Sequence, residues 1–127
     1  MVVPTPSSPL AALIRSEDGD DFLPSKVLVI VAHPDDIDFG TAGTVATLTD
    51  HGVEVVYGLV TSGQAGEPAD LSPVDLAELR EAEQGAAATI VGVSELHWLG
   101  FPDGAVVADL ELRKAISRLI RIVKPDL

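Results

Sequence analysis

The chain has 127 residues, of which 46% are hydrophobic, and its 20 acidic residues against 8 Lys and Arg give a net charge of −12. This length and apolar content predict one folded domain with its own core. The negative charge argues against nucleic acids and anionic membranes as partners, because both would repel it, but it is compatible with a small neutral substrate and with cations. Without cysteine, a metal could be bound only by His, Asp, Glu, carbonyl groups or water.

The first 25 residues are expected to form a poorly ordered lead-in, because Pro4, Pro6, Pro9 and the acidic run 17–21 interrupt them. No positively charged segment followed by an apolar stretch is present, so no secretory signal is predicted. No run reaches the ~18 apolar residues of a membrane helix. A cytoplasmic location is the resulting expectation, and a homo-oligomer is compatible with the sequence.

Residues 26–127 show strands that alternate with helices. The run 26–32 is apolar without alternation and rich in β-branched residues, which is typical of a strand buried on both faces of a parallel sheet. The pattern then predicts a helix over 41–51, a strand over 53–61, a loop over 62–71, a helix over 73–91, a strand over 95–99 and a helix over 109–124. This order favours an α/β fold with a Rossmann-like, doubly wound, mostly parallel sheet. A fourth strand would begin at 125–127, so we expect the rest of the domain to lie outside this sequence.

The helix over 73–91 has a clear start signal. Ser72 is the expected N-cap, Pro73 suits the first turn and Asp75 completes a capping box. Its expected apolar stripe consists of Leu76, Leu79, Ala86, Ala87 and Ile90. The helix over 109–124 is expected to bury Leu112, Ile116, Leu119 and Val123 along one face.

The turn that follows the first strand concentrates polar side chains. Ligands of open parallel sheets bind beyond the carboxyl ends of the strands, where this turn would lie. Residues three apart in a turn can converge, so His33 and Asp36 can share one metal, whereas Asp35 between them is free for proton transfer. An imidazole and a carboxylate suit Zn²⁺, with Fe²⁺ or Mn²⁺ as alternatives. The competing interpretation is that the acidic residues cap the next helix and that His33 is a surface residue.

Several motifs together resemble one known family. Residues 31–36, Val-Ala-His-Pro-Asp-Asp, resemble the Ala-His-Pro-Asp-Asp signature of the PIG-L/LmbE family of metal-dependent N-acetylglucosamine deacetylases. Further resemblance lies at 40–44, 52–55, in the Thr-x-Gly-x-x-Gly loop at 61–67, in Arg-x-x-Glu at 80–83 and in Leu-Gly-x-x-Asp-Gly at 99–104. The match covers about residues 26–127 and implies the N-terminal part of an LmbE-like domain.

The resemblance implies a zinc-dependent amide hydrolase that acts on an amino-sugar substrate. The implied site residues are the metal ligands His33 and Asp36, the general base Asp35, and the substrate-binding Arg80 and Asp103. Family members complete the metal site with a downstream His, which would lie beyond Leu127. We therefore expect a deacetylase-like domain truncated before its third metal ligand, so that this chain alone would be inactive. The group linked to the sugar is left open.

Two of these residues could instead serve the fold alone. Arg80 and Glu83 fall within the expected apolar stripe. They could form an ion pair at the edge of this stripe, as residues three apart on a helix often do. Alternatively, Arg80 binds the sugar and Glu83 holds the Arg80 side chain in place. Asp103 lies in a Pro-Asp-Gly turn, where turn chemistry by itself is enough to favour Asp, but this rim position would also allow hydrogen bonds to sugar hydroxyl groups. His51 and His97 lie away from the rim and are not expected to bind metal.

Two other function classes are compatible with parts of this pattern. A receiver-like signalling module also has an acidic pair after its first strand, and it would need Asp103 as the phosphorylated residue. The His33-Pro34 pair and the Arg80 helix have no purpose there. The second alternative is a non-catalytic sugar-binding or interaction domain on the same fold.

Overall fold

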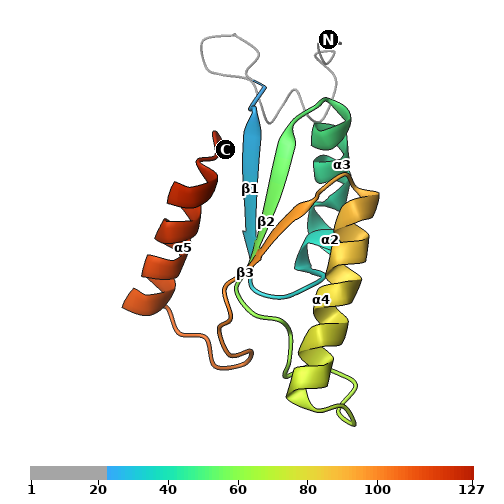
Figure 1. The fold of residues 1–127 in the computed structure, drawn as a ribbon, viewed down its shortest axis with the longest axis vertical. Helices are drawn as coiled ribbons and strands as arrows, with labels where there is room; N and C mark the ends of the chain where they lie inside the picture. The colour runs from blue at the N-terminus through green and yellow to red at the C-terminus, as the bar shows by residue number, and fades with distance from the viewer. Residues whose placement is uncertain (1–22) are drawn as a thin grey trace.

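The computed structural model describes residues 23–127, so the prediction for the lead-in falls almost entirely outside the described residues. The elements in chain order are β1 (Lys26–Val31), α2 (Asp36–Gly40), α3 (Ala42–Asp50), β2 (Glu54–Leu59), α4 (Pro73–Ile90), β3 (Glu95–Trp98) and α5 (Leu110–Val123). The strands form a parallel sheet in the order β1-β2-β3. Helices α3 and α4 lie on one face of the sheet and α5 lies on the other, which confirms the predicted α/β class and its doubly wound arrangement (Figure 1).

The central strand β2 is buried on both faces, whereas β1, for which the sequence predicted this, is fully buried only at Val27 and half-buried elsewhere. The larger core lies between the sheet and the first three helices and contains Val27, Val55, Tyr57, Leu59, Ile37, Val45, Leu48 and Ala88. The smaller core lies under α5 and contains Val56, Leu119 and Val123, with Leu28 and Ile30 packed against them. Successive strand residues point to opposite faces, so the sheet contributes side chains to both cores.

The predicted helix over 41–51 corresponds to α3, and the structure adds before it a short helix that was not predicted. A single turn, α2, precedes α3, and Thr41, with φ −126°, separates them. Asp35 is the N-cap of α2 and has a left-handed backbone (φ 70°), which lets a helix begin directly after the turn. The expectation that an acidic side chain caps the next helix is wrong, because Asp38 lies inside α2 and neither N-cap forms a side-chain bond.

Helix α4 begins as predicted, since Ser72 is its N-cap and accepts a hydrogen bond from the Asp75 N–H (3.1 Å). The predicted apolar stripe is correct at the buried Leu76 but wrong at Leu79, which is 41% exposed, and at Ile90, which is 84% exposed. The fully buried side chains of α4 are Leu76, Gln84 and Ala88. The inward face of α4 thus carries a polar residue, Gln84, in its centre. A pattern based on hydrophobicity alone therefore assigns the wrong face of the helix to the core.

The last residues of the sequence lie against the free edge of β1. The backbone N–H groups of Asp126 and Leu127 both point to the Lys26 carbonyl (2.8 and 3.4 Å), and the Leu28 N–H donates to the Leu127 carbonyl (3.0 Å). This is the pattern of a parallel strand on the side of β1 opposite to β2. It agrees with the predicted start of a fourth strand at 125–127.

Burial also affects the tyrosine in the centre of the sheet. Tyr57 is fully buried and its hydroxyl has no hydrogen-bond partner within the described residues. Desolvation, assisted by the negative charge of Asp38, raises the pKa of Tyr57 to about 12. The side chain therefore remains neutral in the core at ordinary pH.

Gly58 allows α5 to pack closely on β2. A Cβ atom at this position would lie 2.6 Å from the Leu119 Cδ2 and 3.3 Å from the Ile30 Cγ1. We predict that Gly58→Ala lowers the free energy of unfolding by about 1–3 kcal/mol, because the core is overpacked. Urea denaturation of the purified protein measures this change.

Gly85→Ala is the matched control, since nothing lies within 4 Å of a Cβ at this position in α4. Alanine is the better helix former, so this variant should gain roughly 0.5–1 kcal/mol. Equal stability of the Gly58→Ala variant and the unsubstituted protein would show that α5 does not press on Gly58.

Candidate active site

Three loops start at the same level of the sheet. Hydrogen bonding continues past the strand ends, where Thr61 N–H donates to the Ala32 carbonyl (3.0 Å) and Phe101 N–H donates to the Val60 carbonyl (3.0 Å). The Thr61 hydroxyl reinforces this with a second bond to Ala32 (3.0 Å). We call this edge the strand-end rim, formed by the residues directly after β1, β2 and β3. It brings together loops that lie far apart in the sequence.

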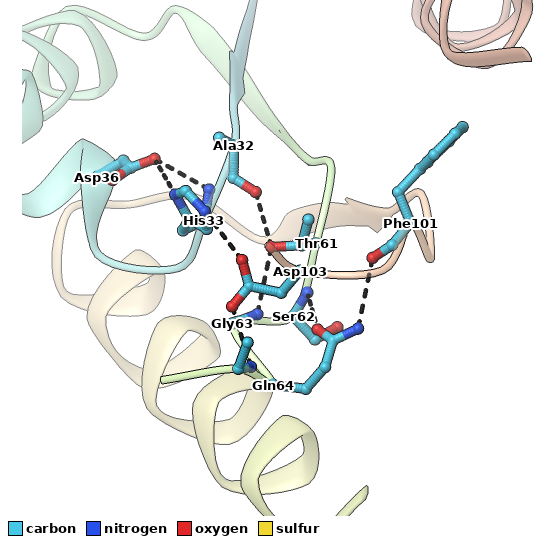
Figure 2. Close-up of polar contacts among 10 residues, drawn as sticks. Ala32, His33, Asp36, Thr61, Ser62, Gly63, Gln64, Phe101 and Asp103 are labelled. Carbon is cyan, nitrogen blue, oxygen red and sulfur yellow. Dashed lines mark hydrogen bonds and ion pairs between the residues drawn. The ribbon is translucent and has the colours of Figure 1, made fainter. Parts of the chain in front are cut away.

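His33 lies on the rim between two carboxylates (Figure 2). Its Nδ1 is 3.4 Å from the Asp36 Oδ2, and its Nε2 is 3.0 Å from the Asp103 Oδ1. The Asp36 carboxylate also accepts the backbone N–H of His33 (2.9 Å). The convergence of His33 and Asp36 that the spacing predicted is therefore present, and the structure adds Asp103 as a third member.

Asp103 is held more firmly than a turn residue requires. Its Oδ2 accepts the Ala65 N–H (3.0 Å), so both carboxylate oxygens have partners within the protein. Its side chain is only 10% exposed, against 48% for His33 and 40% for Asp36. One side chain after β3 thereby joins the loops that follow β1 and β2.

Asp35 stands apart from this group. Its carboxylate is about half exposed and makes no cap bond to α2. The guanidinium of Arg80 lies beside it, with Nη1 3.9 Å from the Asp35 Oδ2. Its backbone N–H donates to the buried Oε1 of Gln84 at 2.6 Å. The carboxylate is thus available on the rim, although its backbone is fixed.

Arg80 reaches the rim from α4 with three partners. Its Nη1 is also 3.5 Å from the Glu83 Oε2, and its Nη2 donates to the Glu67 carbonyl (3.2 Å). The predicted Arg80–Glu83 ion pair is therefore present, but Glu83 is mostly exposed. Because the Arg80 side chain is 30% exposed beside Asp35, some of its surface is available to a ligand.

The loop after β2 is fixed by polar contacts that the sequence did not reveal. The Ser62 hydroxyl donates to the Glu81 carboxylate (2.6 Å), and the Gln64 amide group donates to the Phe101 carbonyl (3.4 Å). Gly63 has a positive φ of 68°, and a Cβ there would lie 3.3 Å from the Pro34 ring. The only sequence signal for Gln84 is its spacing of four from Arg80, which places both on one face of α4. Glu81, which directly follows Arg80, points to a different side and had no such signal.

The donor set fits a divalent metal of the zinc type. When Nε2–H is donated to Asp103, the lone pair of His33 Nδ1 is free on the side of Asp36. One imidazole nitrogen and one carboxylate oxygen are ligands that Zn²⁺, Fe²⁺ and Mn²⁺ accept. Within residues 23–127, however, no group of three or more His, Asp or Glu is arranged to hold a metal. His33 and Asp36 would therefore supply only part of a coordination shell.

Comparison with known proteins bears out the resemblance. Residues 28–127 match the family described as PIG-L: GlcNAc-PI de-N-acetylase. The diacetylchitobiose deacetylase of Thermococcus kodakarensis is 41% identical over 103 residues, which cover 80% of this chain and 39% of that protein. The 1D-myo-inositol 2-acetamido-2-deoxy-alpha-D-glucopyranoside deacetylase of Kineococcus radiotolerans is 38% identical over 68% of this chain and 25% of its own length.

A solved structure supports the same grouping. The N,N'-diacetylchitobiose deacetylase from Pyrococcus horikoshii, complexed with its inhibitor MPG, has a TM-score of 0.78 and 38% identity over 81% of this chain and 39% of that chain. The chain thus spans about two fifths of the length of both diacetylchitobiose deacetylases. No helix within residues 23–127 is long and apolar enough to cross a membrane. Since the family match spans residues 28–127, the chain belongs to the PIG-L family.

Proposed function

We propose that this protein is a metal-dependent hydrolase that removes the acetyl group from an N-acetylglucosamine-containing substrate. The observation that carries the proposal is the separation of roles on the rim. His33 Nδ1 and the Asp36 carboxylate converge to 3.4 Å, whereas the Asp35 carboxylate between them in sequence lies apart and is half exposed. Two ligands and an unused base in one turn are part of what metal-assisted hydrolysis requires.

His33 and Asp36 would hold the metal, with Zn²⁺ as the first choice and Fe²⁺ or Mn²⁺ as alternatives. A bound divalent cation supplies Lewis acidity, which activates water for attack on an amide carbonyl. Asp103, whose Oδ1 lies 3.0 Å from the His33 Nε2, would accept the Nε2–H and so fix the direction in which Nδ1 points. Asp103 would thus support the site even before a substrate arrives.

Asp35 would act as the general base. Its carboxylate takes a proton from the attacking water, whose oxygen adds to the acetyl carbon. The C–N bond then breaks, and the proton passes to the departing amine, so that acetate and a free amino sugar are the products. Arg80, 3.9 Å from Asp35, would donate hydrogen bonds to the sugar, and Asp103 would accept from a hydroxyl through its remaining lone pairs.

The substrate class rests on what two relatives share. Their names describe one substrate with N-acetylated sugars in a chitobiose and one with an acetamido sugar linked to inositol. The acetamido sugar is common to both, and the attached group differs. We therefore propose a small amino-sugar substrate and leave its attached group open.

The third metal ligand would come from a segment beyond Leu127. The hydrogen bonds of Asp126 and Leu127 to β1 support this, because Leu127 stands opposite Val27 in a parallel register. A strand that continued in this register would reach the level of His33 about six residues later, since a strand advances one residue per partner residue. Residues that follow such a strand would meet the rim beside His33 and Asp36.

A receiver-like module fits the rim poorly. Asp103, which would have to be phosphorylated, is 10% exposed and has both oxygens engaged by His33 and the Ala65 N–H. A phosphoacceptor needs a free carboxylate oxygen for attack. The membership in the PIG-L family also argues for the hydrolase.

Substitution of the base tests the mechanism. Asp35→Asn, made in a chain that includes the segment beyond Leu127, should lower kcat for acetate release by about 100- to 10,000-fold, because the amide cannot accept the proton. Metal content should not change. Asp38→Asn, which removes the same charge from the neighbouring α2, serves as the control and should keep its activity. Retained activity in Asp35→Asn would contradict the assignment of the base.

Removal of the metal tests the class of reaction. Dialysis of the chain that includes the segment beyond Leu127 against a chelator should abolish acetate release, and added Zn²⁺ should restore it, because Lewis acidity is lost and then regained. Metal analysis of each sample must accompany the assay. Full turnover by a sample shown to be free of metal would contradict the proposal.

A further inference from the structure

The backbone of Asp35 is held in an unusual conformation. Its φ of 70° lies in the left-handed region, which among the non-glycine residues of the described part only Lys124 shares. This conformation costs an ordinary residue roughly 1 kcal/mol or more, and such residues persist where the surroundings hold them. The Asp35 carbonyl accepts the backbone N–H groups of Asp38 and Phe39 (2.9 and 3.3 Å), which belong to α2 itself. The N–H of Asp35 is bound from outside the turn, by the Gln84 Oε1 at 2.6 Å across 49 positions of sequence.

Gln84 is a costly residue at this position. It is 2% exposed in the middle of α4, and its Nε2 is buried without a hydrogen-bond partner in the described part of the chain. A buried amide nitrogen without a partner destabilises a fold, and an apolar side chain of the same size would avoid that cost. The bond to Asp35 is the one hydrogen bond that the Gln84 side chain makes in the described structure.

The same helix contacts Asp35 twice. Arg80, one turn before Gln84, lies 3.9 Å from the Asp35 carboxylate, while Gln84 binds the Asp35 peptide. Asp35 is also the residue at which the chain turns from the rim into α2, and its carboxylate makes no cap bond there. The direction of this carboxylate therefore depends on the backbone angle that Gln84 supports.

We propose that Gln84 is a positioning residue, which holds the peptide of Asp35 so that its carboxylate points toward the reacting water and away from the His33–Asp36 pair. This inference rests on the proposed function, because it assigns Gln84 to the base of that reaction. Gln84 does not contact the substrate. Its effect is on the geometry of Asp35, and a small displacement of a catalytic group is enough to slow a reaction strongly.

The test compares three variants in a chain that includes the segment beyond Leu127. Gln84→Met keeps the size of the side chain but removes the acceptor, and Gln84→Glu retains a carboxyl oxygen at the same place. Gln64→Met is the control, since Gln64 lies in the neighbouring loop and contacts Ser62 and Phe101 rather than Asp35. Amide hydrogen exchange at Asp35, followed by NMR, reports the contact directly and needs no activity.

We expect fast exchange at Asp35 in Gln84→Met and protection in Gln84→Glu, in Gln64→Met and in the unsubstituted protein. Gln84→Met should also lose about 10- to 100-fold in kcat, with KM, metal content and melting temperature retained, and Gln84→Glu should recover part of the loss. A purely structural role would instead lower the melting temperature and leave kcat unchanged.

Protection of Asp35 in Gln84→Met, or an unchanged kcat despite fast exchange, would overturn the inference. Failure of the proposed function has a different signature, which is the absence of acetate release from the unsubstituted protein. In that case the exchange rate of Asp35 still decides whether Gln84 holds this peptide.

Discussion

The parallel register of the three strands is the constraint on which the rest of the structure depends. Because β1, β2 and β3 run in the same direction and end at one level, the loops that follow them start side by side. His33 and Asp103 are 70 positions apart in sequence, yet their side chains lie 3.0 Å from each other. A shift of one residue in either pairing would turn the side chains of the shifted strand to the other face and break this contact.

Helix α4 is the second determinant of the site, and it serves the site at the expense of the core. Its inward face presents Arg80 and Gln84 to the turn after β1 and Glu81 to the loop after β2. A helix selected for stability alone would fill these places with apolar residues. Local departures from good packing are expected where a protein supports a functional site, and the buried amide nitrogen of Gln84, unpartnered within residues 23–127, is such a departure.

The order of the three strands and of helices α3, α4 and α5 could be predicted from the sequence, because it depends on local patterns. The same is true of the Ser72 cap of α4 and of the burial of Leu119 and Val123 on α5, whose predicted neighbours Leu112 and Ile116 are only half-buried. The convergence of His33 and Asp36 was predictable for the same reason, since three positions separate them. Helix α2 was not predicted, because it begins at the left-handed backbone of Asp35. That backbone is supported by Gln84, a partner 49 positions away that no local pattern reveals.

The contact between His33 and Asp103 escaped prediction for a related reason. Turn chemistry and rim position both suggested a role for Asp103, but its distance from His33 depends on the register of two strand pairs. Once that register is known, Asp103 is seen to be engaged through both oxygens. The carboxylate of Asp103 would therefore have two roles, since it contacts His33 and is also proposed to bind the substrate.

Location of the metal tests the central claim most directly. A crystal structure of a chain that includes the segment beyond Leu127, recorded at the absorption edge of zinc, would give the position of the ion. We predict anomalous density at about 2.0–2.2 Å from the His33 Nδ1 and from an Asp36 carboxylate oxygen, with Asp103 still on Nε2 and Asp35 not coordinated. Density coordinated by Asp35, or by the Nε2 of His33 in place of Asp103, would contradict this assignment of roles.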